Sequence, residues 1–515
     1  MSWQREVEEI EERRRRALEL GGPEAVAGQH ERGRLTVRER VEALADPGSF
    51  REEGPAAGFA ELDEAGALRS FAPANYVLGV AKLEGRPCVV GGEDFTQRGG
   101  SPSPAGLRKS VYAETLAVRL RLPLVRLLEG GGGSVTRSAG RRLPEPVYAP
   151  HRFHSIMQAM ASAPVASAAL GAVAGFPAAR LAASHFAVMA RGTAQVMIGG
   201  PALVERALGV ETDKEALGGA AVHLRSGVVD NVAEDEADAL AQVRRFLSYL
   251  PGNVDELPPV TSCDDPPDRR EETLLEIVPR ERRRVYDARR LLRAVLDRDS
   301  FFEMTAGFGR SQVTGLARLA GVPVGVWAND PRFYAGAMTA DGAQKVRRFV
   351  DLCDTFHLPV VCFVDEPGFM IGPEAERSGT IRHGAAAIFA VQQSSVPWAS
   401  VIVRKAYGVA AAAHFGPEAH VLSWPSAESG ALPVEGGVAV AFRREIAAAE
   451  DPAARRAELE DRLAATRSPF PRAESFGVQD LVDPRDTRPA LCAWARWVQP
   501  GLAALRGPRA FGPRP

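Results

Sequence analysis

One local pattern occurs twice in this 515-residue chain, about 235 positions apart. A proline opens an apolar stretch, an acid stands six residues after it, and glycines come directly afterwards or nearly so: PLVRLLEGGGG from Pro123 and PVVCFVDEPGF from Pro359. A second pattern follows in each half, where PVASAALGAVAG from Pro164 and PWASVIVRKAYG from Pro397 both reach a glycine eleven residues after the proline. From the first proline to the last glycine the distance is 52 positions in one half and 49 in the other. This shared register indicates an internal duplication.

The repeated glycines stand where buried strands are predicted to end. Because glycine has no side chain, such a turn exposes its backbone N–H groups, and two turns can direct two donors to one point, as in an oxyanion hole. The turn at 129–134 (EGGGGS) can serve this purpose, or it can be a structural tight turn. A phosphate loop is a further alternative, but the chain has no GxxxxGK[ST], and the turn does not fit GxGxxG. The turn at 365–372 (DEPGFMIG) is more specific, since an acidic strand end leads into a rigid turn and an apolar segment.

Length and order of elements predict two α/β domains. A chain of 515 residues is too long for a single core. Short apolar strands alternate with helices from about residue 86 to 250 and again after residue 320, which predicts parallel pairing with helical crossovers. The proline- and acid-rich stretch between them is the best linker candidate. The predicted boundaries are 1–255 for the first domain, 256–280 for the linker and 281–515 for the second domain.

Composition excludes several classes of protein. A net charge of −2 does not suit a general nucleic-acid binder. No apolar run approaches the roughly 18 residues that a membrane span needs, and the charged amino terminus does not resemble a targeting peptide, so we expect a soluble cytoplasmic protein. The five cysteines form no CxxC or CxxH spacing, so we expect packed thiols and no metal site.

Titratable residues near the turns have competing interpretations. His383 and His414 are candidate bases, although a packed or surface role suits each equally well. Acids at the strand ends are better explained as loop anchors than as a glycosidase pair. The basic residues near the first turn can be solvated or can contact the phosphates of an adenine-nucleotide tail. They are Arg98, Arg108, Lys109, Arg137, Arg141 and Arg142.

From about Arg38 to Asp486 the chain resembles the carboxyltransferase (beta) subunit of biotin-dependent acyl-CoA carboxylases, such as those acting on propionyl-CoA and methylcrotonyl-CoA. The stretches that carry the resemblance are RERVEALADPGSFRE, VVGGEDFTQRGGS, GGPALVERALG, EALGGAAVH, SGVVDNVAEDEADAL, GAQKVRRFVDLCDTFHLPVVCFVDEPGFMIG, IRHGA, VIVRKAYG and VDPRDTRP. The chain departs from the family pattern at the first glycine turn, at Val409, where the family has a second glycine, and at Pro433. These departures leave the acyl substrate open.

The resemblance implies a fold of two tandem crotonase-like spiral domains and a hexamer built as a trimer of dimers. It implies an active site between the first domain of one protomer and the second domain of its partner. One hole, on the acyl-CoA side, would comprise Gly131, Gly132, Ala174 and Gly175. The other, on the biotin side, would comprise Gly368, Phe369, Gly408, Val409 and Ala410. Cofactor contacts would come from Arg98, Arg108, Lys109, Pro367 and Tyr407.

The implied activity is transfer of a carboxyl group from carboxybiotin to the carbon beside a coenzyme A thioester, or to its vinylogous position. The chain has no Met-Lys-Met biotin-attachment site and no evident biotin carboxylase module. Biotin would therefore be carried by a separate protein, with a biotin carboxylase and a carboxyl carrier protein, or a fused alpha subunit, as partners. Two alternatives remain: a decarboxylase subunit that runs the transfer backwards, and an inactive scaffold paralogue.

Overall fold

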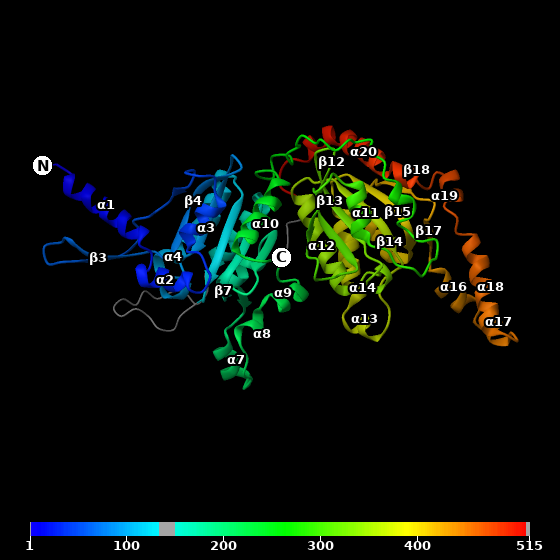
Figure 1. The fold of residues 1–515 in the computed structure, drawn as a ribbon, viewed down its shortest axis with the longest axis horizontal. Helices are drawn as coiled ribbons and strands as arrows, with labels where there is room; N and C mark the ends of the chain where they lie inside the picture. Colours follow the sequence, from blue (N-terminus) through cyan, green and yellow to red (C-terminus); the bar gives the residue numbers. More distant parts are fainter. Residues whose placement is uncertain (1, 133–149, 511–515) are drawn as a thin grey trace. The chain divides into compact units, whose positions relative to one another are not determined.

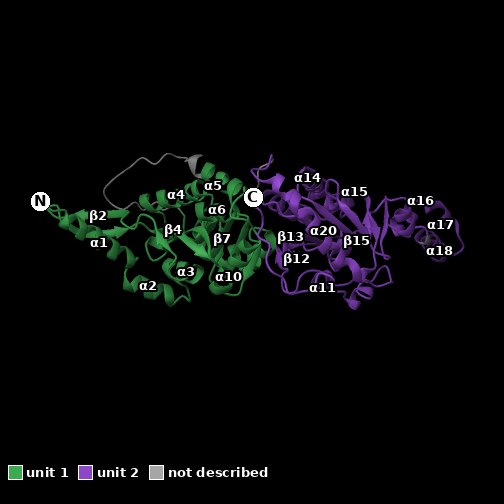
Figure 2. Ribbon diagram, turned by 90° about the horizontal axis from the view of Figure 1, so that it is seen from above, with its two compact units in different colours: residues 1–256, 514–515 green, residues 257–513 purple. Residues whose placement is uncertain are grey.

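The computed structural model describes residues 2–132 and 150–510 and divides the chain into two compact units (Figures 1 and 2). Unit 1 takes in the described residues up to Glu256, and unit 2 takes in those from Leu257 onward. Gly133, Ser134, Arg137, Arg141 and Arg142, which the sequence places in or near the first turn, lie outside the described residues.

Unit 1 is built on an eight-stranded sheet with the order β1-β4-β5-β6-β7-β8-β10, in which β9 also pairs with β7. The pairs β1/β4 and β4/β5 are antiparallel, and the remaining pairs are parallel. Its strands are β1 (Arg51–Glu52), β4 (Tyr76–Leu83), β5 (Arg86–Glu93), β6 (Leu124–Gly130), β7 (Val165–Ala174), β8 (Phe186–Ala190), β9 (Gln195–Met197) and β10 (Asn231–Ala233). A separate hairpin comprises β2 (Gly58–Leu62) and β3 (Leu68–Pro73).

The described part of unit 1 contains ten α-helices, several of which cover the sheet. They are α1 (Gln4–Leu18), α2 (Pro23–His30), α3 (Val37–Leu44), α4 (Pro104–Leu120), α5 (Pro150–Ser162), α6 (Phe176–Ala182), α7 (Pro201–Leu208), α8 (Lys214–Gly218), α9 (Ala220–Ser226) and α10 (Glu236–Ser248), with the short 3-10 turn η1 (Arg98–Gly100). Every residue of β6 is buried, as are nine of the ten residues of β7. Such continuous burial is typical of parallel strands that are covered on both faces.

Unit 2 repeats this topology strand for strand. Its sheet has the order β11-β12-β13-β14-β15-β16-β18, and β17 pairs with β15 as β9 pairs with β7. Here too the first two pairs are antiparallel and the rest are parallel. The strands are β11 (Phe302–Met304), β12 (Gln312–Leu319), β13 (Val322–Asn329), β14 (Val360–Glu366), β15 (Trp398–Tyr407), β16 (His420–Ser423), β17 (Glu428–Gly430) and β18 (Asp480–Leu481).

The helices of unit 2 are α11 (Ala288–Val295), α12 (Ala340–Thr355), α13 (Pro373–Arg377), α14 (Thr380–Gln393), α15 (Gly408–Ala411), α16 (Val434–Ala441), α17 (Arg443–Ala448), α18 (Pro452–Ala465), α19 (Phe470–Glu474) and α20 (Thr487–Leu502). The 3-10 turns are η2 (Glu272–Leu275), η3 (Tyr334–Gly336), η4 (Ala412–His414), η5 (Pro484–Asp486) and η6 (Ala503–Leu505). Helices α16, α17 and α18 pack on one another around a small apolar core of their own.

The two units agree in detail. The pairing of β6 with β7 shifts register between Leu128 and Gly130, and that of β14 with β15 shifts between Val364 and Glu366, at the same place in the repeat. Helices α4 and α12 start with equivalent caps, because Ser103 accepts from the Gly106 amide and Thr339 accepts from the Gly342 amide. The duplication and the tandem α/β fold predicted from the sequence are therefore confirmed.

The parallel pairing predicted for the strands from Arg86 onward and after residue 320 is confirmed. The antiparallel pairs that start each sheet involve strands that were not predicted. Strand β4 was not predicted, because the sequence reading began its strand–helix alternation at Arg86. Most of the stretch proposed as a linker, residues 257–280, lies in unit 2, where Leu274 and Ile277 belong to the main apolar core.

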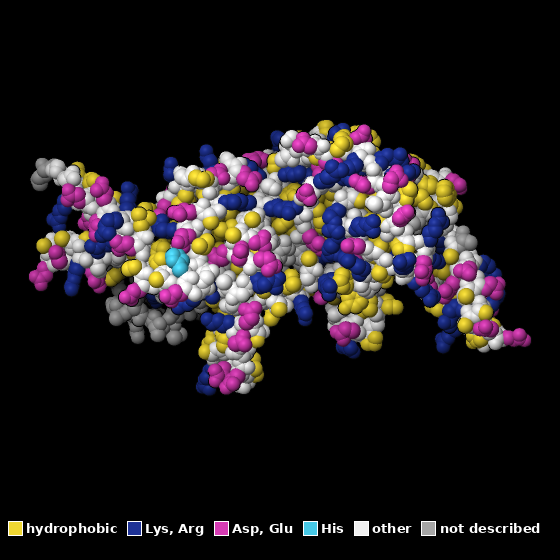
Figure 3. All heavy atoms as spheres, in the orientation of Figure 1, with side chains coloured by type: hydrophobic (Ala, Val, Ile, Leu, Met, Phe, Trp, Pro, Cys, Tyr) yellow, Lys and Arg dark blue, Asp and Glu magenta, His cyan; other side chains and the backbone are white. Residues whose placement is uncertain are grey.

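Acidic and basic side chains are interspersed over the face shown in Figure 3. Within residues 2–132 and 150–510, no helix combines the length and apolarity that a bilayer crossing requires.

Candidate active site

The glycine turns of unit 1 follow the carboxyl ends of β6 and β7 and lie against each other. Gly130 pairs with Val173, and two residues further on the chain reaches Gly132 and Gly175. A Cβ atom built on Gly132 would lie 2.9 Å from the Ala174 carbonyl oxygen and 3.6 Å from the Gly175 Cα. The structure thus brings together the four residues predicted for the first hole. Only a residue without a side chain permits so close an approach.

Not every amide of these turns is available to a ligand. The Gly131 N–H donates to the Gly99 carbonyl at 3.1 Å, and the Gly175 N–H donates to the Met197 carbonyl at 3.3 Å. The Gly132 carbonyl accepts from the Ser101 hydroxyl at 2.6 Å. The Gly132 amide has no acceptor within the described residues, so it is the strongest donor candidate in this turn.

The acid that ends the apolar run of β6 is an anchor. The carboxylate of Glu129 is fully buried and contacts Arg40 at 2.6 Å, Arg34 at 3.0 Å and the Gln29 amide at 2.7 Å. In unit 2, Asp365 stands in the equivalent position and pairs with Arg404 at 2.9 Å. Both acids hold the strand ends in place, as the sequence suggested.

Replacing Glu129 with alanine is expected to destabilise unit 1 by about 3–5 kcal/mol, because the buried guanidinium of Arg40 loses a partner. Differential scanning calorimetry should show a clear fall in Tm. The matched control is Glu19→Ala, which removes an exposed ion pair with Arg15 and should leave the Tm almost unchanged. Equal effects of the two substitutions would contradict the anchoring role.

The first turn of unit 2 follows β14 and is held differently. The Gly368 N–H donates to the carboxyl of Glu366 at 2.9 Å. Phe369 forms an isolated parallel bridge with Met338: the Met338 N–H donates to the Gly368 carbonyl at 3.1 Å, and the Met370 N–H donates to the Met338 carbonyl at 2.9 Å. In such a bridge the amide of the middle residue points away from its partner. The Phe369 N–H is therefore directed away from Met338.

The second turn of unit 2 follows β15, where Gly408, Val409 and Ala410 begin α15. Glu366 pairs with Ala406, so Gly368 and Gly408 each stand two residues beyond a paired position, as Gly132 and Gly175 do in unit 1. The first amides of a helix have no acceptor within the helix. The Val409 side chain is 64% exposed, so its added bulk points outward from the unit.

The residues predicted to contact cofactors differ in exposure. Arg98 and Arg108 are exposed, the first in η1 next to Gly99 and the second on α4. Pro367 is half-buried in the first turn of unit 2. Lys109 is largely buried, donates to the Gly54 carbonyl at 3.1 Å and has a pKa lowered to about 8, chiefly by burial. This placement does not support contact between Lys109 and a nucleotide phosphate.

Tyr407 is also buried. Its hydroxyl donates to Glu428 at 2.8 Å, and burial together with that carboxylate raises its pKa. Arg282 pairs with the same carboxylate at 2.6 Å. Through these contacts Tyr407 anchors the end of β15, directly before the turn at Gly408.

Sequence reasoning missed several residues of the site. Ser101 was not considered, although it holds Gly132. Phe176 occupies in unit 1 the position that Val409 occupies in unit 2, and extending the internal alignment by one residue would have found it. Glu366 was read only as part of an acidic strand end.

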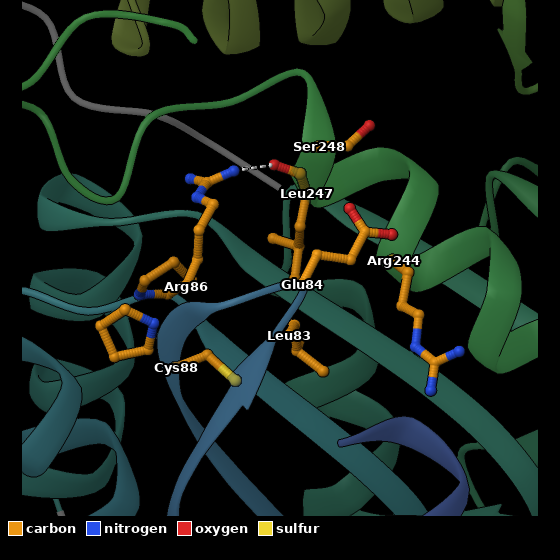
Figure 4. A pocket seen from close by; sticks show the side chains of 9 residues that line it. Leu83, Glu84, Arg86, Cys88, Arg244, Leu247 and Ser248 are labelled. Atoms are coloured by element: carbon orange, nitrogen blue, oxygen red, sulfur yellow. Dashed lines mark hydrogen bonds between the residues drawn. The ribbon is translucent and has the colours of Figure 1, made fainter. Parts of the chain in front are cut away.

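A small pocket lies far from the glycine turns within unit 1 (Figure 4). It is lined by residues at the start of β5 and at the end of α10, and Arg86 there donates to the carbonyls of Leu247 at 3.0 Å and Leu250 at 2.7 Å. Because β5 begins here, this is the amino-terminal edge of the parallel strands. Ligands of open α/β sheets bind at the opposite, carboxyl edge, where the glycine turns are.

Two tandem α/β units of one topology, each with paired turns at the carboxyl ends of its central strands, define a protein of the crotonase-like class. The chain matches the carboxyl transferase domain over residues 28–498 and belongs to that family.

Known relatives match almost the whole chain. It is 35% identical to the propionyl-CoA carboxylase carboxyltransferase subunit of Haloferax mediterranei, over 97% of each chain. It is 31% identical to the methylmalonyl-CoA decarboxylase subunit alpha of Veillonella parvula, over 95% of this chain and 94% of that one. Among solved structures, it resembles the transcarboxylase 12S hexamer with methylmalonyl-coenzyme A and methylmalonic acid bound, with a TM-score of 0.86 and 31% identity over 99% of this chain and 97% of that one.

Proposed function

We propose that this chain is the carboxyltransferase component of a biotin-dependent acyl-CoA carboxylase. The observation that carries the proposal is the duplicated pair of glycine turns, one pair in each unit, in a chain of the carboxyl transferase family. Carboxyl transfer develops negative charge on two reactants, so two sets of preorganised N–H donors suit the reaction. Bound carboxybiotin would supply the carboxyl group and receive the substrate proton in return.

In this proposal unit 1 takes the acyl-CoA. As the carbon beside the thioester loses its proton, the thioester oxygen becomes negative and needs donors. The Gly132 amide is the first candidate, with Gly131, Ala174 and Gly175 shaping the turns around it. Loss of one such donor typically costs about 100-fold or more in kcat.

Unit 2 takes the biotin side. The Phe369 amide and the first amides of α15, at Gly408, Val409 and Ala410, would face the ureido oxygen. Gly368 contributes its shape and not its N–H, since that group already donates to Glu366. The turns supply backbone N–H donors only. A side-chain base is not needed if the carrier's biotin accepts the substrate proton.

We further propose that the protein acts in the cytoplasm as a homo-hexamer, with a biotin carboxylase and a biotinylated carrier as separate partners. The hexameric assembly named for the transcarboxylase relative supports the oligomer. The inactive-scaffold alternative is disfavoured by the well-formed turns in both units.

One assay tests the activity. The protein is incubated with biotin carboxylase, biotinylated carrier, ATP, labelled bicarbonate and a panel of acyl-CoAs. Label is expected in at least one acyl-CoA. The reverse transfer is a second candidate, favoured by similarity to the Veillonella decarboxylase subunit. It is tested by incubating the protein with unlabelled carrier and with malonyl- or methylmalonyl-CoA as the carboxyl donor. Absence of transfer in both directions would overturn the proposal.

Two exposed basic residues of unit 1, Arg98 and Arg108, supply a further prediction. Because a guanidinium pairs well with phosphate, the double substitution Arg98→Ala and Arg108→Ala should raise the KM for the acyl-CoA by about tenfold. The corresponding acyl-pantetheine, which lacks the nucleotide phosphates, is the control and should show the same KM with both proteins. An equal rise for both thioesters would place these arginines elsewhere.

A further inference from the structure

Behind the first turn of unit 2 lies a buried carboxyl group that the proposed mechanism does not use. Glu366, the last residue of β14, is fully buried. Its Oε1 accepts from the amides of Gly368 at 2.9 Å and Met338 at 3.3 Å, and its Oε2 accepts from the Asn329 side chain at 3.1 Å. One carboxyl group thus holds three N–H donors around the turn.

The repeat shows how unusual this carboxyl is. In unit 1 the position of Glu366 is taken by Gly130, and an acid stands instead at Glu93, the position of Asn329. That acid is balanced by Arg180 at 3.0 Å. Within the described residues, the ion-pairing side chain nearest to Glu366 is His414, with its Nε2 at 3.9 Å.

His414 belongs to a continuous group of buried side chains. Its ring stacks on Trp327 with centroids 4.0 Å apart. The Trp327 indole donates to Gln312 at 2.8 Å, and Asn329 donates to both Gln312 and Glu366. These five side chains enclose the back of the turn.

Burial sets the charge of the pair. It lowers the pKa of His414 to about 3, so the ring is neutral at physiological pH. Burial raises the pKa of Glu366 well above the ordinary value, although the hydrogen bonds from Gly368, Met338 and Asn329 act in the opposite direction. A buried group without a strong counter-charge is expected to become neutral in this way.

The turn itself depends on these contacts. The Gly368 amide donates to Glu366, and the Met338 amide is shared between Glu366 and the Gly368 carbonyl. The bridge between Met338 and Phe369 directs the Phe369 N–H to the opposite side. The Phe369 ring packs on Gly384, where an added Cβ would lie 2.2 Å from the ring. Backbone and ring together leave Phe369 one orientation.

We propose that Glu366 is a buried positioning residue, which fixes the Phe369 amide as the donor of this turn through its hydrogen bonds to the Gly368 and Met338 amides and to Asn329. The inference rests on the proposed function, because it assumes that an anion forms on the outer side of the turn. A carboxylate at Glu366 would oppose that anion, whereas a neutral acid or an amide would not.

The test compares Glu366→Val, which removes the acceptor, with Glu366→Gln, which retains a neutral acceptor. We expect Glu366→Val to lower the kcat of label transfer at least tenfold with the KM for acyl-CoA unchanged, and Glu366→Gln to remain within about threefold of the wild type. Glu374→Gln, an exposed position on α13, is the control and should have no effect. Loss of activity in Glu366→Gln equal to that in Glu366→Val would overturn the inference.

Hydrogen exchange followed by mass spectrometry, without substrate, gives a second readout. In Glu366→Val the segment 367–370 should exchange faster, while 129–132 in unit 1 should not change. Unchanged exchange at 367–370 would refute the positioning role even if activity fell. If the wild type transfers no label while the exchange contrast holds, the proposed function fails and the structural role of Glu366 survives.

Discussion

Replacing Gly132 with alanine is expected to lower the kcat of carboxyl transfer by about 100-fold or more while the protein remains folded. Gly132 has φ of 76°, which side-chain-bearing residues adopt at a cost, and its added Cβ would lie 2.9 Å from the Ala174 carbonyl oxygen. Since that oxygen is backbone, the two turns must separate. A displacement of about 1 Å is enough to cost 100-fold when a donor must meet a developing charge.

A matched control isolates the effect of the close approach. Gly66, in the hairpin turn between β2 and β3, has φ of 75°, and an added Cβ there would meet nothing within 4 Å. Gly66→Ala therefore carries the same backbone cost without disturbing the site, and it should keep near wild-type kcat. Comparable losses in both variants, or full activity in Gly132→Ala, would show that the contact between the turns is not needed.

The repeat is visible in the sequence because its determinants are local. A strand covered on both faces is predominantly apolar, as β6 and β14 are apart from Arg126 and the acids near their carboxyl ends, and the tight turn after it requires glycine. The resemblance to the carboxyltransferase family is likewise carried by short continuous stretches. Fold class and family could both be predicted from such features.

Which amides are free to bind a ligand could not be predicted. The acceptors that engage Gly131 and Gly175 are the carbonyls of Gly99 in the turn η1 and of Met197 in strand β9. Lys109 shows the same limit, because its partner is the carbonyl of Gly54, 55 residues away. From the sequence alone, Lys109 would be expected on an exposed helix face, because the segment around Gly54 that covers it is distant in the chain.

The antiparallel start of each sheet escaped prediction for a related reason. Alternation of strands and helices indicates parallel pairing only where a helix separates two strands. Between β4 and β5 the connection is a two-residue turn, Glu84–Gly85, which reverses the chain. Recognising that hairpin in the sequence would have corrected the topology of unit 1.

In unit 2, Gly408→Asp is expected to reduce kcat at least 100-fold more than Gly408→Asn. Gly408 has φ of 63°, a conformation that asparagine and aspartate tolerate better than other residues. Both substitutions place a Cβ about 3.3 Å from the Ala431 carbonyl oxygen, so they share the same steric cost. They have nearly the same shape and differ chiefly in charge, and a carboxylate about 5 Å from a developing anion costs roughly 3 kcal/mol at an effective dielectric constant of about 20.

The comparison of Gly408→Asp with Gly408→Asn therefore measures whether negative charge develops at the second turn of unit 2. Label transfer from carboxylated carrier should be measured with both variants at one ionic strength and at saturating acyl-CoA, so that the difference reports kcat. Similar activity of the two variants would mean that no anion forms near Gly408, and the biotin side of the reaction would then have to lie elsewhere. A large difference, together with the loss in Gly132→Ala, would place one anion at each unit's pair of turns, as transfer between two reactants requires.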